Sequence, residues 1–234
     1  MDKPTIESLG ALLSLVIHDL RNPTATLSAN ISFINDVFDS IHNGIFADDD
    51  TKDIKEALLD TNIALGELMN GLDAFSWVTR WVTGREIVEL EEGDVVAELN
   101  AIAQHEKRVR IEIDAREGAL MVRGGNVVPK LLETLIANSI QHAPYGIIRV
   151  VAQKKGEDYV LVQIRDQGLA VAEDLRDKVF TLEGQVLIKG RRDGRYSRVV
   201  GLFAAATMAE AIAARLEADG QDGDAVFRIY LKRV

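Results

Sequence analysis

The chain has 234 residues, of which 47% are hydrophobic and 27% charged, a composition typical of a soluble globular protein with one or two domains. Its 27 basic and 37 acidic side chains leave a net charge of −10, so no nucleic-acid partner is expected. Cysteine is absent, which excludes disulfides, thiolate metal sites and cysteine nucleophiles. Neither a signal peptide nor an apolar run of about 18 residues is present, so the sequence predicts a cytoplasmic protein without a membrane span.

Two long helices are predicted first, over residues 5–43 and 51–82. Apolar residues in both recur in alternating steps of four and three, which is the pattern of a heptad seam. Gly44 between them suits the end of a helix, and the aspartates that follow suit the start of the next. The predicted seams are Leu9, Leu13, Val16, Leu20, Pro23, Leu27, Asn30, Ile34, Val37 and Ile41, and then Ile54, Leu58, Thr61, Leu65, Leu68, Leu72, Phe75, Thr79 and Val82.

An antiparallel helical hairpin has little core of its own, and two hairpins form a four-helix bundle when the chain dimerises. Further apolar residues widen the stripe beyond one seam, which favours a homodimer: Leu12, Ile17, Ile31, Ile63 and Met69. The alternative is a hairpin that packs within one chain on the second half. Trp77 and Trp81 are predicted to pack where the hairpin meets that half.

From about residue 94 the pattern changes to short helices and alternating strands. This mixture predicts an α+β sandwich, in which helices cover one face of a sheet. We therefore expect two domains, at residues 1–83 and 84–234. The predicted helices are 95–107, 126–143, 171–180 and 201–219, the strands are 109–114, 119–123, 146–155, 158–166 and 225–233, and residues 184–198 form a polar loop.

The most specific string is HDLRNP, residues 18–23. His18 lies off the heptad seam and is predicted to face solvent, with Asp19 beside it. Pro23 costs a helix interior about 3 kcal/mol and predicts a kink one turn beyond His18. The string resembles the H-box of sensor histidine kinases, which reads His, Glu or Asp, Leu, Arg, Thr or Asn, Pro, and it matches at all six positions.

This resemblance spans nearly the whole chain. The hairpin is similar to the dimerisation and histidine-phosphotransfer domain of that family. The second half is similar to its catalytic, ATP-binding domain, which has the histidine kinase/gyrase-type ATPase fold. The resemblance implies a homodimer that uses ATP and Mg²⁺.

The N-box of the family reads Asn-Leu-x-x-Asn-Ala-x-x-His, and TLIANSIQH, residues 134–142, is similar to it. The resemblance implies that Asn138 holds Mg²⁺ and that His142 belongs to the nucleotide site. Thr134 stands where the family has the first asparagine. From the residues alone, Asn138 on an apolar helix is a polar group that needs a hydrogen-bond partner, and a purely structural amide is the alternative.

The first glycine box of the family, Asp-x-Gly-x-Gly, resembles DQGLA at residues 166–170. The resemblance implies that Asp166 accepts a hydrogen bond from the adenine amino group. It also implies that Gly168 lets the backbone pass close to the base. Ala170 replaces the second glycine.

The second glycine box, Gly-x-Gly-Leu-Gly-Leu, aligns with SRVVGL at residues 197–202, where Gly201 and Leu202 match. Val199 replaces a glycine, and valine strongly disfavours a positive φ. The polar loop before this box is basic, and its cations pair with nucleotide phosphates or form a solvated loop. They are Lys189, Arg191, Arg192, Arg195 and Arg198.

The resemblance implies a histidine kinase: His18 takes the γ-phosphate of ATP and passes it to an aspartate of a response-regulator receiver domain. Asp19 would orient the imidazole and accept its proton. Asp19 and Asn22 keep the spacing that serves the reverse, phosphatase activity in the family.

Three other functions compete with the kinase. An ATP-independent histidine phosphotransferase is favoured by Ala170 and Val199, whereas Asn138 and Asp166 favour the kinase. A scaffold that transfers nothing leaves the exposed His-Asp pair unexplained. A general ATPase of the chaperone and gyrase group leaves the H-box unexplained, and Thr134 occupies the place of its catalytic glutamate.

Overall fold

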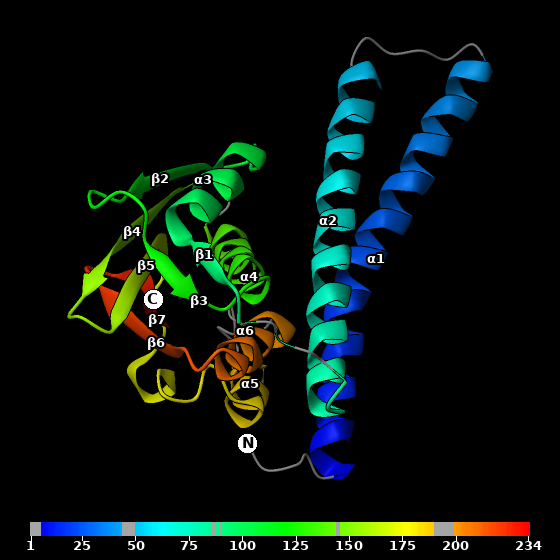
Figure 1. Ribbon diagram of the computed structural model, residues 1–234. Coiled ribbons are helices and arrows are strands. Elements are labelled where there is room, and N and C mark those ends of the chain that lie inside the picture. Colours follow the sequence, from blue (N-terminus) through cyan, green and yellow to red (C-terminus); the bar gives the residue numbers. More distant parts are fainter. Residues whose placement is uncertain (1–5, 44–49, 86–87, 89, 144–145, 190–198) are drawn as a thin grey trace.

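The computed structural model describes residues 6–43, 50–85, 88, 90–143, 146–189 and 199–234. Helices α1 (Ile6–His42) and α2 (Asp50–Val82) form a long hairpin beside an α/β region (Figure 1). Both predicted helices are thus confirmed. Within the described residues, no helix is long and apolar enough to cross a membrane.

On α2, the contact with α1 is displaced by one residue at every second position of the predicted seam, whereas the seam positions between them are half-buried. Ala57 and Ala64 are buried, and α1 is the element that lies beside this part of α2 (Figure 1). A Cβ on Gly71 would come within 3.2 Å of Leu20. These three small residues recur every seven positions and let the helices approach closely. Leu58 and Leu65, predicted at the seam, are instead 47% exposed.

The hairpin consequently presents large apolar side chains to solvent. Single exposed apolar residues are common, but a continuous stripe of them marks an interaction surface. They are Leu13, Ile17, Ile31, Phe33, Phe38, Leu58, Leu59, Leu65, Met69 and Leu72.

The α/β region contains two sheets. In the larger sheet the strand order is β2-β4-β5-β7-β6, with β2 and β4 parallel and the other neighbours antiparallel. Strands β1 and β3 form a separate antiparallel pair. The strands are β1 (Glu92–Asp94), β2 (Arg110–Asp114), β3 (Met121–Arg123), β4 (Ile147–Lys155), β5 (Tyr159–Leu169), β6 (Arg215–Gln221) and β7 (Asp224–Lys232).

The helices of this region lie between the large sheet and the hairpin (Figure 1). Val160, Val162 and Ile164 alternate along β5 and are fully buried, as the predicted strand requires. The expected α+β architecture with one covered face is therefore confirmed. The helices are α3 (Val95–His105), α4 (Val127–His142), α5 (Leu182–Lys189) and α6 (Val199–Ala211), with a 3₁₀ turn at Glu173–Leu175.

Three predicted elements were wrong. The helix over 171–180 shrinks to the 3₁₀ turn. The loop over 184–198 begins instead as α5, because the hydroxyl of Thr181 accepts the N–H of Gly184 at 3.0 Å and Gln185 and Ile188 are buried.

The helix predicted over 201–219 ends at Ala211, and strand β6 follows it. Ala213 adopts a positive φ of 53°. The N–H of Ala214 then bonds to the carbonyl of Ala209 at 2.8 Å, which closes the helix. The strands β1 and β6 were both missed by the sequence prediction.

Helix α6 joins the hairpin to the α/β region. Apolar residues surround it on all sides, as expected for a helix that is buried all round. It packs against α1, α2, α4 and α5. One continuous core therefore runs from Val16 on α1 and Trp77 and Val78 on α2 into the sheet. Trp77 is 2% exposed, which confirms its predicted place at the junction, and Trp81 is half-buried.

Candidate functional site

His18 lies on α1 with its side chain 43% exposed, as predicted for a residue off the seam. Its Nδ1 is 3.4 Å from Oδ1 of Asp19, whose side chain is only 10% exposed. Asn22 follows four residues later and is exposed, so it shares the face of His18 on the next turn. The imidazole is therefore accessible to a partner on one side and contacts a carboxylate on the other.

Helix α1 continues through Pro23. The proline has no N–H, so it cannot donate the usual bond to the carbonyl of Asp19. Its ring is buried, and apolar burial offsets part of that cost. Next to it, the hydroxyl of Thr24 donates to the carbonyl of Leu20 at 2.6 Å.

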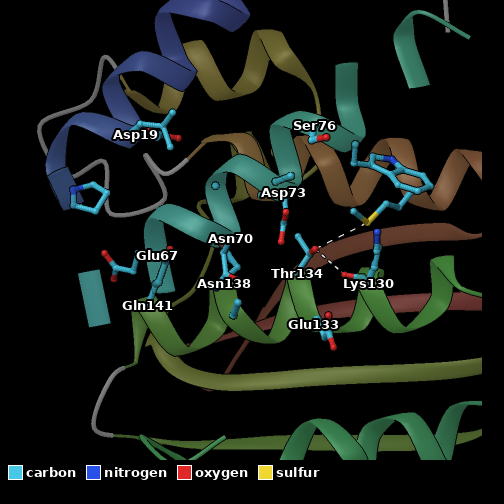
Figure 2. A pocket seen from close by; sticks show the side chains of 18 of the residues that line it. Asp19, Glu67, Asn70, Asp73, Ser76, Lys130, Glu133, Thr134, Asn138 and Gln141 are labelled. Atoms are coloured by element: carbon cyan, nitrogen blue, oxygen red, sulfur yellow. Dashed lines mark hydrogen bonds between the residues drawn. The ribbon is translucent and has the colours of Figure 1, made fainter. Parts of the chain in front are cut away.

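A cavity of about 240 Å³ lies between the hairpin and α4. Asp19 and Pro23 line it from α1, while Asn138 and Thr134 line it from α4 and Gly201 from α6. Figure 2 shows residues of α2, among them Asn70 and Asp73, above the α4 residues Thr134 and Asn138. The fold thus brings the predicted H-box, the N-box and the end of the second glycine box to one cavity.

The cavity walls carry more negative than positive side chains. Four carboxylates line it, two from α2 and one each from α1 and α4, against two cations. An excess of carboxylates disfavours a polyphosphate unless a cation accompanies it. The charged lining residues are Asp19, Glu67, Asp73, Glu133, Arg80 and Lys130.

Buried polar atoms without partners gather where α4 meets the end of β5. Asp166 is 1% exposed, and its Oδ1 accepts the N–H of Gly168 at 2.8 Å. Its Oδ2 and Nδ2 of Asn138 have no hydrogen-bond partner among the described residues. Because buried polar groups are nearly always paired, these atoms suit a polar ligand, and they fit the base end of a nucleotide.

Gly168 is required by close packing. A Cβ at this position would lie 2.7 Å from Oδ1 of Asp166, 3.2 Å from Cβ of His142 and 3.3 Å from the His142 carbonyl. Gly220 packs closely against Ala170 in the same way, because a Cβ on Gly220 would lie 2.6 Å from Cβ of Ala170. The strand β5 extends to Leu169, beyond the predicted end at residue 166, and its register shifts after Asp166, which is a bulge within the strand.

Residues 199–202 of the second glycine box form the first turn of α6. Leu202 is fully buried in the core. A Cβ placed on Gly201 would lie 3.9 Å from Cγ2 of Thr134. Arg191 and Arg192, predicted to hold phosphates, lie outside the described residues. Within the described ranges, no group of three or more His, Cys, Asp or Glu side chains has a metal-binding arrangement.

Burial raises the pKa of the Asp166 carboxyl above its ordinary value of 3.8, while the Ser139 hydroxyl and the Gly168 N–H lower it in part. The folded state therefore binds this proton more tightly than the unfolded state. The protonated carboxyl therefore contributes its full stabilisation of the fold below pH 3.8, the ordinary pKa that applies to the unfolded chain. This contribution is lost as the pH rises through the higher pKa of the folded state.

We expect Asp166→Asn to remove this loss, because an amide stays neutral. Urea unfolding of the wild type and of Asp166→Asn across that pH window measures the free energy of unfolding of each protein. The contributions of all other titrating groups cancel in the difference between the two values. Asp158→Asn, at an exposed carboxylate, is the control and keeps the wild-type pH profile. Parallel profiles for Asp166→Asn and wild type would contradict the prediction.

The sequence analysis missed the contribution of α2 to the cavity. Asn70, Asp73, Trp77 and Arg80 recur in steps of three, four and three, which places them on one face of α2. This mostly polar stripe was the available signal. It was overlooked because the apolar heptads dominate the helix.

Comparison with known proteins agrees with this architecture. Residues 126–234 match the family described as histidine kinase-, DNA gyrase B-, and HSP90-like ATPase. The chain is 24% identical to the sensor protein KdpD of Clostridium acetobutylicum over 95% of its length, which is 24% of that protein. It is 31% identical to the methanogenesis regulatory histidine kinase FilI of Methanothrix harundinacea over 71% of its length and 18% of that protein. The chain thus spans a quarter or less of these relatives.

Two solved structures share the fold. The histidine kinase AdeS of Acinetobacter baumannii superposes with a TM-score of 0.58 at 15% identity, over 92% of this chain and 98% of that one. The histidine kinase ThkA, solved in complex with the response regulator TrrA, gives 0.58 at 16% identity, over 98% of this chain and 63% of that one. Residues 126–234 thus match the ATPase domain that histidine kinases share with DNA gyrase B and HSP90. The chain as a whole is similar in sequence and in fold to sensor histidine kinase transmitters.

Proposed function

We propose that the chain is the kinase core of a two-component system, in which His18 takes the γ-phosphoryl group of ATP and passes it to an aspartate of a receiver domain. Residues 1–83 would dimerise and carry the phosphohistidine, and residues 84–234 would hold the nucleotide. The observation that carries the proposal is the shared cavity. Asp19, which contacts His18, lines one side of it, and Asn138 and Gly201 line the other.

In the proposed reaction the imidazole of His18 attacks the γ-phosphorus, the bond to the bridging oxygen breaks, and ADP leaves. Asp19 holds the ring through Nδ1 and accepts the proton that the ring loses. Asp166 would hold the base, and Asn138 would hold Mg²⁺, which neutralises charge on the phosphates. The exposed amide of Asn22 faces the same side as His18 and would align water for dephosphorylation of the receiver.

The second candidate, an ATP-independent phosphotransferase, is favoured by the size and charge of the cavity. Its volume of about 240 Å³ falls below the roughly 300–1,000 Å³ of ligand pockets. Carboxylates outnumber cations on its walls. Helix α6 already begins at Val199, where the family has a glycine loop. In this function His18 would receive its phosphate from one receiver and return it to another.

Transfer of labelled γ-phosphate from Mg·ATP to the purified protein separates the two functions. The kinase predicts acid-labile, alkali-stable label on the wild type and its loss in Asn138→Ala. Asp158→Asn, far from the cavity lining, is the control for handling. An unlabelled wild type that still accepts phosphate from a phosphorylated receiver would overturn the kinase and establish the phosphotransferase.

The exposed apolar stripe of the hairpin supports the proposed homodimer. We expect Leu65→Glu to raise the dimer dissociation constant roughly 100-fold, because it would bury a carboxylate in the bundle. Sedimentation equilibrium measures this constant. Gln104→Glu, which adds the same charge on the exposed side of α3, is expected to leave it unchanged. A wild type that sediments as a monomer at all concentrations would contradict the dimer.

A further inference from the structure

Two large apolar side chains that are adjacent in the sequence are exposed on α5. Val186 is 45% exposed and Leu187 is 46% exposed, whereas Gln185 and Ile188 anchor the same short helix in the core. A single exposed apolar residue is common, but an adjacent pair on a well-anchored helix is a candidate contact surface. Val186 and Leu187 are called the α5 pair below.

Helix α5 packs against α1, the helix that carries His18. Leu12 of α1 and Ile188 of α5 belong to the same core. Leu12 and Asp19 are seven positions apart and share one face of α1, and the side chain of Asp19 is only 10% exposed. Because adjacent residues of an α-helix point about 100° apart, His18 lies roughly a quarter-turn around α1 from that face. Helix α5 therefore flanks the face of α1 that presents His18.

A receiver domain that exchanges phosphate with His18 must bring its aspartate into contact with the imidazole. Nδ1 of His18 lies 3.4 Å from Oδ1 of Asp19, so Nε2 is the ring nitrogen left to bond to phosphorus. When the receiver is the donor, the bond from phosphorus to its aspartate oxygen breaks, the N–P bond forms, and Asp19 takes the proton from Nδ1. Both candidate functions contain this step, in one direction or the other.

The size of a specific protein interface brings α5 within reach of such a receiver. An interface of standard size covers about 800 Å² on each partner, which is a disc of about 16 Å radius. The axes of packed helices are only about 8–10 Å apart. A receiver centred on His18 therefore extends over α5. A second copy of the chain is the less suitable occupant, because the exposed apolar stripe assigned to the dimer lies on the hairpin itself.

We propose that Val186 and Leu187 form a second docking contact for the receiver domain, beside the contact that α1 makes around His18. This role rests on the proposed function, in which His18 exchanges phosphate with a receiver. It gives the α/β region a part in partner recognition that is independent of nucleotide binding.

The rate of phosphate transfer to the chain, measured against the concentration of a phosphorylated receiver domain, tests this contact. We expect Leu187→Glu to raise the half-saturating receiver concentration about 10- to 100-fold, because a carboxylate replaces a leucine that docking would bury. The limiting rate should change little, since His18 and Asp19 are unaltered. Leu90→Glu is the matched control, because Leu90 is a leucine exposed to a similar degree outside α5, and it should keep the wild-type value.

Phosphoramidate, a small donor that needs no docking surface, gives the second readout. Leu187→Glu should take phosphate from it at the wild-type rate. Equal loss with both donors would show that α5 acts through the fold of α1, and an unchanged half-saturating concentration would show no contact. Either result would overturn the docking contact and leave the proposed function standing. A wild type that phosphoramidate labels but that exchanges phosphate with no receiver domain would overturn the proposed function together with the contact.

Discussion

His18→Gln is expected to abolish phosphorylation of the chain from every donor. The imidazole is the nucleophile that both candidate functions share, and glutamine keeps the length and polarity of the side chain without that nucleophile. Incorporation of label should fall below detection both with Mg·ATP and with a phosphorylated receiver domain. Fold and stability should change little, because the side chain is 43% exposed.

The control for this variant is His42→Gln, at an exposed histidine near the end of the same helix. It should retain the wild-type level of label. Asp19→Asn is expected to be intermediate, with a rate roughly 10²–10⁴-fold lower, because an amide does not accept the ring proton. Full labelling of His18→Gln, or loss of label in His42→Gln, would place the phosphate elsewhere.

Trp77→Ala is expected to give the largest loss of stability, about 3–5 kcal/mol. Trp77 is 2% exposed and belongs to the core that runs from the hairpin into the sheet. Truncation of such a side chain removes its burial and leaves a cavity. Because the same core joins the two halves of the chain, the loss should shift the unfolding of both.

Urea unfolding followed by far-UV circular dichroism measures this loss. Trp81→Ala is the matched control, since Trp81 lies one turn later on α2 and is only half-buried. Trp81→Ala should lower the free energy of unfolding by clearly less than Trp77→Ala. Equal destabilisation by the two substitutions would show that Trp77 does not join the halves. A separate early transition of the hairpin in the wild type would contradict the single core.

Local patterns in the sequence were sufficient for the long elements. The helices α1 and α2 and the strand β5 follow from periodicity, which depends on each segment alone. The position of His18 off the seam follows from the same counting. The end of α6 could not be predicted in this way, because no glycine or proline occurs between Ala211 and Gly220 and the chain turns at Ala213 with a positive φ. Pairing of β6 with β7 supplies the backbone hydrogen bonds that a longer helix would have made.

The sequence by itself determined the class of elements, the H-box and the polar residues of α4. Only the tertiary structure decided which face of α2 meets α1, since Ala57 and Ala64 allow a closer approach than the leucines beside them. It also decided that Asp19 and Asn138, 119 positions apart in the chain, line one cavity. Periodicity identifies faces of a helix, but long-range packing through α6 selects which faces meet.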